Sequence, residues 1–172
     1  MLEILRKRTI DLSEKEIIDI YSLFEIVFHK KRNVCSFHEQ FENTSKGYSY
    51  HAIAVENGKI VGHNVYLPFT YLYNETPFLL CLSVDAMIHP EYRGRGLYRQ
   101  LLEACEGMAV SDGCVLRIGF PNDISYPLQV NKFKYNDVGK LDTYMLPINI
   151  GMLNPKLKFL NFITRGLSSV VC

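Results

Sequence analysis

The chain has 172 residues, of which 48% are hydrophobic and 22% are charged, and its formal net charge is +1. This length and composition suit one globular domain with a sizeable core and exclude a disordered chain. General nucleic-acid binding is not expected, because it draws on a strongly basic surface. Membrane insertion is not expected either, since no apolar run reaches the roughly 20 residues of a membrane span.

The cysteines and histidines indicate a cytoplasmic protein without a metal site. The five cysteines are odd in number and form no Cys-x-x-Cys pair, which is typical of reduced thiols. The five histidines lack the spacing of metal ligands. The N-terminus begins with charged residues where a secretory signal would carry a long apolar stretch.

The N-terminal part of the chain predicts a strand followed by two helices. Residues 2–9 form a short strand candidate. Ser13 followed by Glu16 matches a capping box, and apolar residues then recur at helical spacing as far as Phe28. A weaker second helix is expected over residues 35–43, where two phenylalanines lie four positions apart.

A β-hairpin is expected next. Residues 50–55 and 60–73 have the pattern of strands, and Asn57-Gly58 between them is a strong hairpin signal. The second strand is long and contains Pro68, which cannot donate a hydrogen bond to a neighbouring strand. We therefore expect a bulge, a bend or a sheet edge at this proline.

A Gly-rich basic turn lies between a strand and a helix. Residues 79–88 have the pattern of a buried strand, and Pro90 then turns the chain. The turn itself, residues 93–98, has the sequence Arg-Gly-Arg-Gly-Leu-Tyr, and the apolar residues after it fall on one helical face as far as Ala109. This arrangement predicts an anion site, because the first amides of a helix lack partners and carry the positive end of its dipole.

Two well-known anion-binding turns do not fit this segment. A P-loop requires Gly-Lys-Ser or Gly-Lys-Thr, and neither sequence occurs in the chain. A dinucleotide-binding turn requires a third glycine where this chain has Arg99, and it comes early in its domain, whereas this turn lies past mid-chain.

The turn resembles the acyl-CoA motif of the GNAT superfamily of N-acetyltransferases, which is Gln/Arg-x-x-Gly-x-Gly/Ala. Arg93 and Gly96 match the motif, and residues 87–92 are similar to the end of that family's fourth strand. Tyr98 is a departure, since a ring stands where Gly or Ala usually lets the helix approach the phosphates.

The C-terminal part predicts a strand over 114–120, a helix over about 124–132 and a final strand over 135–148. Pro127 must lie in the first turn of that helix or break it. Residues 149–172 depart from the strand pattern and end in an apolar tip. They are expected to complete the sheet irregularly, to form a homodimer interface, or to begin a further part of a longer protein.

A second block resembles the same family, and the two blocks together imply its fold. Asn122 and Ser125 match the Asn and the small residue that follow the family's fifth strand, whereas Lys134-Tyr135 replaces its usual Gly-Phe. The predicted order is β-α-α-β-β-β-α-β-α-β. The resemblance implies an α/β (α+β) domain over residues 1–148, with a mixed, mostly antiparallel sheet flanked by helices.

The resemblance implies acetyl-CoA as the acyl donor. In this family the pantetheine arm pairs with the open backbone of the fourth strand, and the diphosphate lies against the Gly-rich turn. The residues that the resemblance places at this donor site are Ala86, Met87, Ile88, Arg93, Gly94, Arg95, Gly96, Leu97, Tyr98 and Asn122.

Three residues are candidates for proton transfer. Asp85 lies in an otherwise apolar strand, where desolvation would raise its pKa, so it is the first candidate for the base, with a structural carboxylate as the alternative. His89 is the second candidate, with a turn element as the alternative. Gln129 occupies the position of the family's usual Tyr acid, so Tyr126 is the candidate that protonates the leaving thiolate.

Substrate recognition is expected at the first two helices and their connection, roughly residues 29–50. Aromatic residues gather there and form either a substrate wall or core packing, namely Phe28, Phe37, Phe41, Tyr48 and Tyr50. The basic cluster Lys30-Lys31-Arg32 is interpreted as surface cations beside the C-terminal end of the first helix, where the helix dipole favours positive charge.

The function that follows is transfer of an acetyl group from acetyl-CoA to a primary amine in a ternary complex. A small amine is expected as the acceptor, with an amino sugar as one candidate. The alternative is an acyl-CoA-binding or regulatory module with little catalysis, which Gln129 and Tyr98 favour.

Overall fold

The structure is a computed structural model that describes residues 1–141. The strands within this range are β1 (Leu2–Arg8), β2 (Tyr50–Glu56), β3 (Lys59–Tyr73), β4 (Thr76–Ile88) and β5 (Cys114–Gly119). The α-helices are α1 (Glu14–Phe28), α2 (Phe37–Glu42) and α3 (Leu97–Ser111). Short 3₁₀ turns lie at Thr9–Asp11, Val34–Ser36 and Pro90–Tyr92, and a π-helical turn lies at Leu128–Lys132.

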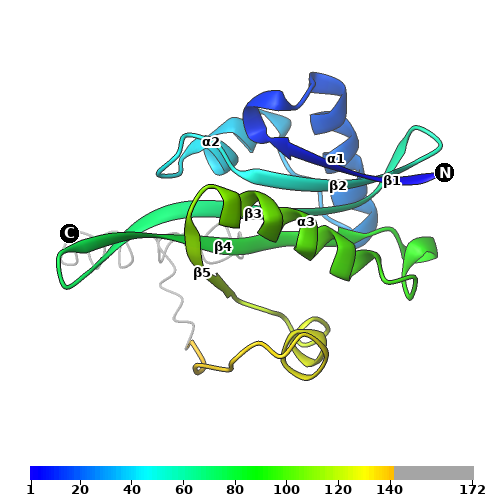
Figure 1. Ribbon diagram of the computed structural model, residues 1–172. Helices are drawn as coiled ribbons and strands as arrows, with labels where there is room; N and C mark the ends of the chain where they lie inside the picture. The colour runs from blue at the N-terminus through cyan, green and yellow to red at the C-terminus, as the bar shows by residue number, and fades with distance from the viewer. Residues whose placement is uncertain (142–172) are drawn as a thin grey trace, which may run out of the picture. The chain divides into compact units, whose positions relative to one another are not determined.

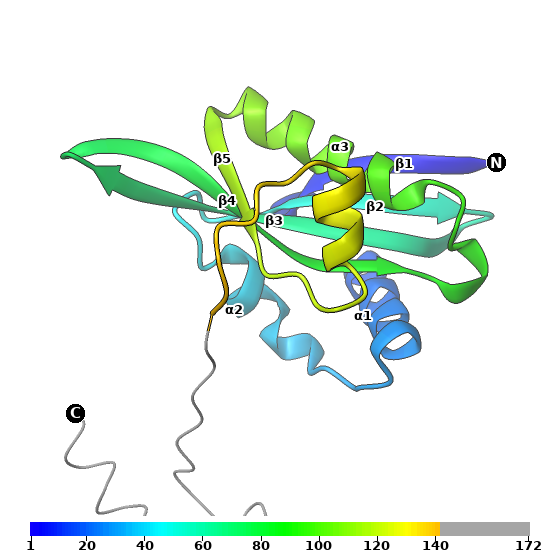
Figure 2. The ribbon, with the colours of Figure 1, turned by 90° about the horizontal axis from the view of Figure 1, so that it is seen from below.

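The chain divides into two units, of which the first is Met1–Ser125 and the second begins at Tyr126. In the first unit, the strands form one sheet in the order β1-β2-β3-β4-β5. All neighbours are antiparallel except β4 and β5, which are parallel. Helices α1 and α2 cover one face of the sheet and α3 covers the other (Figures 1 and 2). The predicted fold class, a mostly antiparallel sheet flanked by helices, is confirmed.

The local signals of the N-terminal half are confirmed. Ser13 accepts a hydrogen bond from the Glu16 amide and forms the predicted capping box of α1. The β2–β3 turn uses Asn57 at φ 51° and Gly58 at φ 73°, as expected for a tight hairpin. Pro68 lies in the part of β3 beyond its pairing with β2, so the expected sheet edge is correct, while the bulge lies elsewhere in the strand.

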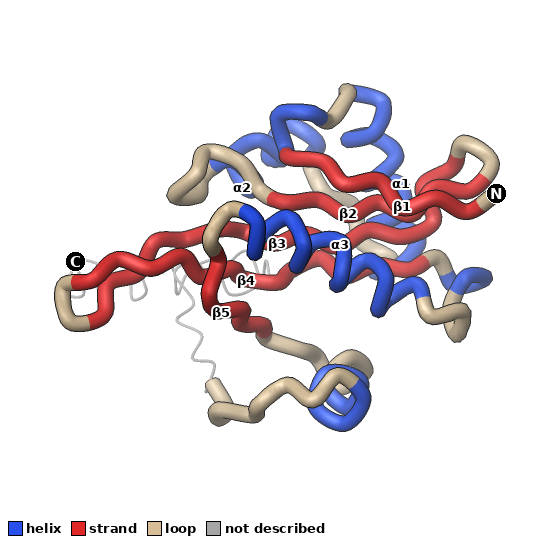
Figure 3. The backbone as a smooth tube through the Cα atoms, in the orientation of Figure 1, coloured by secondary structure: helices blue, strands red, loops and turns tan. Residues whose placement is uncertain are grey.

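The C-terminal expectations need correction. The helix predicted over about 124–132 ends at Lys132 as expected and holds Pro127 in its first turn, but it begins at Tyr126 and is π-helical from Leu128. No strand forms over residues 135–141 (Figure 3), where the Asp137 carboxylate accepts a hydrogen bond from the Gly139 amide. The remainder of that predicted strand and the segment 149–172 lie outside the described residues.

The strand predicted over 79–88 forms as part of β4, but it is buried only in part. Leu79 to Cys81 are buried, but the next five residues of β4 are half-buried or exposed. For the residues from Val84 on, the physical reason is that β5 pairs with β4 only as far as Ser83, so these residues lack a neighbour on that side. Met87 is buried again because its side chain joins the core beneath α1.

The core explains most of the aromatic residues. Phe37, Phe41 and Tyr50 are fully buried, so core packing, and not a substrate wall, accounts for them. Tyr48 is half-buried and its hydroxyl donates to Asp112 at 2.7 Å. Phe28, at the end of α1, is also half-buried and packs against the core from outside.

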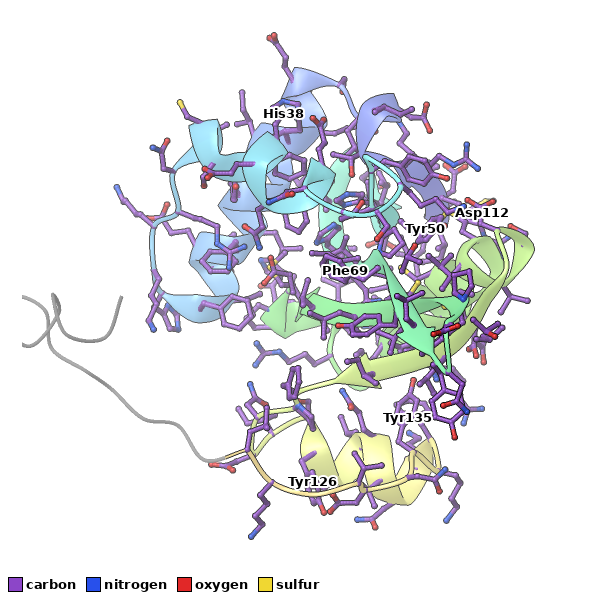
Figure 4. The ribbon with its side chains drawn as sticks, turned by 90° about the vertical axis from the view of Figure 1, so that its left-hand side faces the viewer. His38, Tyr50, Phe69, Asp112, Tyr126 and Tyr135 are labelled. Atoms are coloured by element: carbon purple, nitrogen blue, oxygen red, sulfur yellow. The ribbon has the colours of Figure 1, made fainter. Side chains whose placement is uncertain are left out.

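Two contacts hold α3 against the sheet. Gly62 of β3 lets the helix approach closely, since a Cβ there would lie 3.0 Å from the Leu101 side chain. At the other end of α3, Asp112 accepts hydrogen bonds from the hydroxyls of Tyr48 and Tyr50, at 2.7 and 2.9 Å (Figure 4). These hydrogen bonds lower the pKa of Asp112, the larger effect coming from Tyr48.

A pair of buried histidines lies on the opposite face of the sheet, toward α2. Nδ1 of His51 lies 3.0 Å from Nε2 of His63, and Nε2 of His51 lies 3.0 Å from the Thr9 hydroxyl. Both rings are fully buried. Burial lowers the pKa of His63 to about 4 and the pKa of His51 well below its ordinary value, so both rings are neutral in the folded protein.

The described helices include none that is both long enough and apolar enough to cross a membrane.

We predict that Gly62→Ala lowers the free energy of unfolding by about 2 kcal/mol, because the added methyl overpacks the contact with α3. The matched control is Gly107→Ala, which faces open space within the helix. That substitution should raise stability by about 0.5–1 kcal/mol through helix propensity. Urea unfolding of both variants checks the prediction, and equal effects of the two substitutions would contradict it.

We also predict that stability falls between pH 7 and pH 5. The unfolded chain protonates its histidines below about pH 6.5, whereas folded His63 stays neutral until about pH 4. The shifted pKa of His63 alone should then lower the free energy of unfolding by about 2 kcal/mol between pH 7 and pH 5. His51 should lower it further. Urea unfolding at both pH values measures the loss.

His63→Gln should flatten this pH dependence, while His38→Gln, on the exposed side of α2, should retain it. A wild-type protein that is equally stable at pH 7 and pH 5 would show that the buried rings do not behave as described.

Candidate active site

A bulge in β4 is the centre of the candidate site. The register between β3 and β4 shifts next to Asn64, so that Asp85 and Ala86 of β4 lie opposite this single residue. Asp85 adopts φ 50°, in the left-handed region that non-glycine residues rarely occupy. A β-bulge changes the direction of nearby side chains and interrupts strand pairing. Non-glycine residues with left-handed backbone are concentrated at functional sites.

The backbone after the bulge has a free edge. Beyond Ser83, no strand among the described residues pairs with the side of β4 that faces β5. The three residues predicted to pair with the pantetheine arm, Ala86, Met87 and Ile88, lie on this edge. Backbone groups on that side are therefore geometrically able to pair with an added extended chain, except that the Ile88 carbonyl already accepts a hydrogen bond from Arg93.

The Gly-rich turn follows directly and has room for an anion. Gly94 and Gly96 adopt φ 77° and 76°, and a Cβ at either position would meet nothing within 4 Å. Gly96 is the N-cap of α3. Within residues 1–141, the amides of 94–97 have no recorded hydrogen-bond acceptor. Open amides at a helix N-terminus form the predicted anion site.

The side chains of the turn lie around these amides. Arg93 is exposed, and its Nε donates to the carbonyl of Ile88 at 3.3 Å. Arg95 is exposed and lies over the ring of Tyr92, with 4.8 Å between its guanidinium carbon and the ring centroid. Tyr98 is half-buried in the first turn of α3. Both arginines are thus held near the turn, where they can add positive charge to the anion site.

Asp85 is not the isolated carboxylate that its apolar sequence neighbours predict. Both terminal nitrogens of Arg32 donate to it, with Nη2 3.3 Å from Oδ1. Nε2 of Gln40 lies 3.5 Å from Oδ2. These contacts match the alternative interpretation of Asp85, a hydrogen-bonded structural carboxylate, because a guanidinium balances its charge. The assignment of Asp85 as the base stays a prediction.

Sequence reasoning missed Arg32. We interpreted the basic cluster as surface cations beside the helix end, but the Arg32 guanidinium turns inward, 3.8 Å from the centroid of the Phe24 ring. Only 26% of its side chain and 14% of that of Asp85 are exposed. No sequence pattern joins two residues that are 53 positions apart. A solitary carboxylate in an apolar strand is nevertheless a signal that a cationic partner must be found.

A pocket opens beside this ion pair. It has a volume of about 270 Å³ and is lined by Phe24, Phe28, Lys30, Arg32 and Asp85. The end of α1 and the segment after it form one wall, and the β4 bulge forms the other. This location agrees with the sequence prediction that the acceptor binds near the connection between the first two helices. Another cavity, of about 200 Å³ beside Lys15 and Lys59, lies away from the free edge of β4.

His89 has the contacts of a turn element. Its Nδ1 accepts a hydrogen bond from the Glu91 amide at 3.4 Å, and its own amide donates to Val61 at 2.9 Å. Its ring packs edge-on against Tyr92. These contacts correspond to the alternative reading of His89, in which it shapes the exit from β4.

Asn122 and Tyr126 are engaged in local contacts. Oδ1 of Asn122 accepts hydrogen bonds from the amides of Ile124 and Ser125, at 3.1 and 3.0 Å, and so closes a turn. Tyr126 belongs to the second unit, where its hydroxyl donates to Asp137 at 2.5 Å. This hydrogen bond raises the pKa of Tyr126, which makes it a weaker acid. Neither predicted role is tested by these contacts.

Across residues 1–141, no group of three or more His, Cys, Asp or Glu side chains is arranged to hold a metal ion.

Comparison with solved structures shows the same fold in several acetyltransferases. A Trypanosoma brucei acetyltransferase has a TM-score of 0.66 and 16% identity, over 85% of this chain and 100% of that one. An aminoglycoside acetyltransferase from an uncultured soil metagenomic sample, in complex with sisomicin, has a TM-score of 0.61 and 19% identity, over 84% and 93%. AAC(6')-Iy, in complex with a CoA-containing bisubstrate analog, has a TM-score of 0.66 and 14% identity, over 84% and 97%.

At these identities the structural likeness establishes the fold alone. No curated protein gives a significant sequence match to the chain. The sequence model of the acetyltransferase (GNAT) domain, however, matches residues 8–132. This match covers well over half of the chain and contains the β4 bulge, the Gly-rich turn and α3. The protein therefore belongs to the GNAT acetyltransferase family.

Proposed function

We propose that this protein transfers an acetyl group from acetyl-CoA to a primary amine of a small molecule, in a ternary complex. One observation carries the proposal. The free edge of β4, residues 84–88, leads directly into a turn with open amides and also holds a carboxylate beside a pocket. Donor and acceptor sites can thus meet at a single strand.

The donor fits this edge and turn. The pantetheine arm would pair with backbone groups of Ala86 to Ile88, as a peptide adds to a sheet edge. The diphosphate would lie against the amides of residues 94–98, with Arg93 and Arg95 as charge-assisted partners. The glycine positions support this fit, because no side chain occupies the space above either glycine.

The acceptor reacts by direct attack. Its ammonium gives one proton to a base, for which Asp85 is the candidate, and the free amine attacks the thioester carbonyl. A C–N bond forms and the C–S bond breaks. The attacking nitrogen gives up its second proton to solvent or to a protein group, and the CoA thiolate takes up one proton from solvent or from a protein acid. A strand amide near the carbonyl would stabilise the developing oxyanion. Holding both substrates in the reactive geometry lowers the activation barrier, by up to about 7–11 kcal/mol in favourable systems.

The alternative function is a module that binds acyl-CoA with little catalysis. The ion pair between Arg32 and Asp85 favours it, because a carboxylate already occupied by a guanidinium is less available to an amine. Binding of acetyl-CoA without acetylation of any amine would support this alternative.

We predict that Arg93→Ala weakens acetyl-CoA binding about tenfold, through loss of charge-assisted phosphate contacts. Lys46→Ala is the matched control, because exposed Lys46 lies near Asp112 at the opposite end of α3, and it should leave the Kd unchanged. Isothermal titration calorimetry with acetyl-CoA and with CoA measures both. An unchanged Kd for the Arg93 variant would remove this residue from the donor site.

We predict that Asp85→Asn lowers kcat by about 10² or more while the Kd for acetyl-CoA stays within twofold, because the carboxylate acts on the amine and not on the donor. Asp19→Asn, a carboxylate of α1 paired with Lys15, is the control. Release of free CoA thiol over a panel of amines gives the rates. Wild-type turnover by the Asp85 variant would exclude this residue as the base.

A further inference from the structure

The pocket beside Asp85 carries more positive than negative charge. Lys30 and Arg32 contribute two cations and Asp85 one anion. Asp85 is already balanced by Arg32. Lys30 is exposed at the pocket, and no carboxylate within residues 1–141 forms a recorded ion pair with it. One cation of the pocket is therefore available to a ligand.

The rest of the lining is aromatic. The ring centroids of Phe24 and Phe28 lie 4.7 Å apart, and the Arg32 guanidinium packs on the Phe24 ring. Such a surface suits an apolar group or the face of a sugar. A polycationic amine would add charge to a pocket that is already positive, which costs free energy in a partly desolvated site. An anionic substituent on the acceptor would instead complete the charge balance.

We propose that the acceptor is an amine that also carries a carboxylate or a phosphate group, and that it binds by exchanging the Arg32–Asp85 ion pair. The ammonium of the acceptor replaces Arg32 at Asp85. The released guanidinium and Lys30 then bind the anionic group. Every charge keeps a partner through the exchange, so opening the ion pair leaves no buried ion uncompensated. Arg32 thereby acts as a specificity-determining residue.

This substrate class rests on the proposed acetyltransferase function and makes it more specific. The exchange also explains how Asp85 can be paired in the free protein and still receive an amine. An amine without an anion could displace Arg32 only by leaving its guanidinium unpaired beside Phe24. The pocket therefore discriminates against polyamines and against amines that carry only hydroxyl groups.

The test compares matched amines by CoA release. One pair is phenylalanine and phenylalanine amide, which differ in the carboxylate, and the other is glucosamine 6-phosphate and glucosamine, which differ in the phosphate. Kanamycin represents a polycation. We expect kcat/KM to be at least about tenfold higher for the anionic member of one pair. The pair that shows the difference identifies the anion as carboxylate or phosphate.

The variants separate recognition from folding. Arg32→Gln and Lys30→Gln should each lower kcat/KM for the anionic amine by about tenfold or more, with a much smaller effect on its uncharged counterpart. Lys30 is exposed, so its variant tests the proposal even if Arg32→Gln folds poorly. Lys31→Gln is the control, because Lys31 pairs with Glu25 outside the pocket. This variant should leave the ratio of kcat/KM between the anionic amine and its uncharged counterpart unchanged.

The outcomes distinguish this proposal from the function on which it rests. Turnover of uncharged or polycationic amines in preference to anionic ones would overturn the substrate class and leave the acetyltransferase function standing. If no amine is turned over, calorimetry with CoA present compares the members of each pair. Equal or absent binding of the anionic amine overturns the proposal. Failure of acetyl-CoA itself to bind the wild-type protein would remove the proposed function as well.

Discussion

The pairing between β4 and β5 ends at Ser83, and this loss of a neighbour is the constraint on which the site depends. β4 stays in place because β3 continues to pair with it as far as Ile88. Its other edge then presents backbone donors and acceptors, which most sheets keep covered because exposed edges invite aggregation. In this family member the uncovered edge is the surface on which an extended donor can be bound.

The position of α3 turns this edge into a continuous site. Gly62 brings the helix close to β3, and the hydrogen bonds of Asp112 hold its C-terminal end to β2 and the preceding loop. With both contacts made, the N-terminus of α3 follows the end of β4 through a turn in which two glycines take left-handed conformations. The helix dipole and the open amides thus lie where the strand edge stops.

On the opposite face, Asp85 and Arg32 balance each other's charge. The β4 bulge directs Asp85 toward Arg32, while burial keeps His51 and His63 neutral in the adjacent core. Because both rings are neutral, the core avoids the free-energy cost of a buried imidazolium charge. Under the proposed function, the carboxylate and the guanidinium at the pocket are the groups that an acceptor would engage. The same two side chains can therefore govern both proton transfer and the choice of substrate.

The sequence by itself determined the features that depend on near neighbours along the chain. The capping box at Ser13, the turn at Asn57-Gly58 and the Gly-rich entry to α3 each follow from local backbone preferences. Only the tertiary structure decided the partner of Asp85, the burial of Phe37 and the absence of a strand over residues 135–141. These outcomes depend on which distant segments meet and on where a strand loses its neighbour. Periodicity and spacing carry no information about such contacts, because their energies come from packing and charge pairing across the fold.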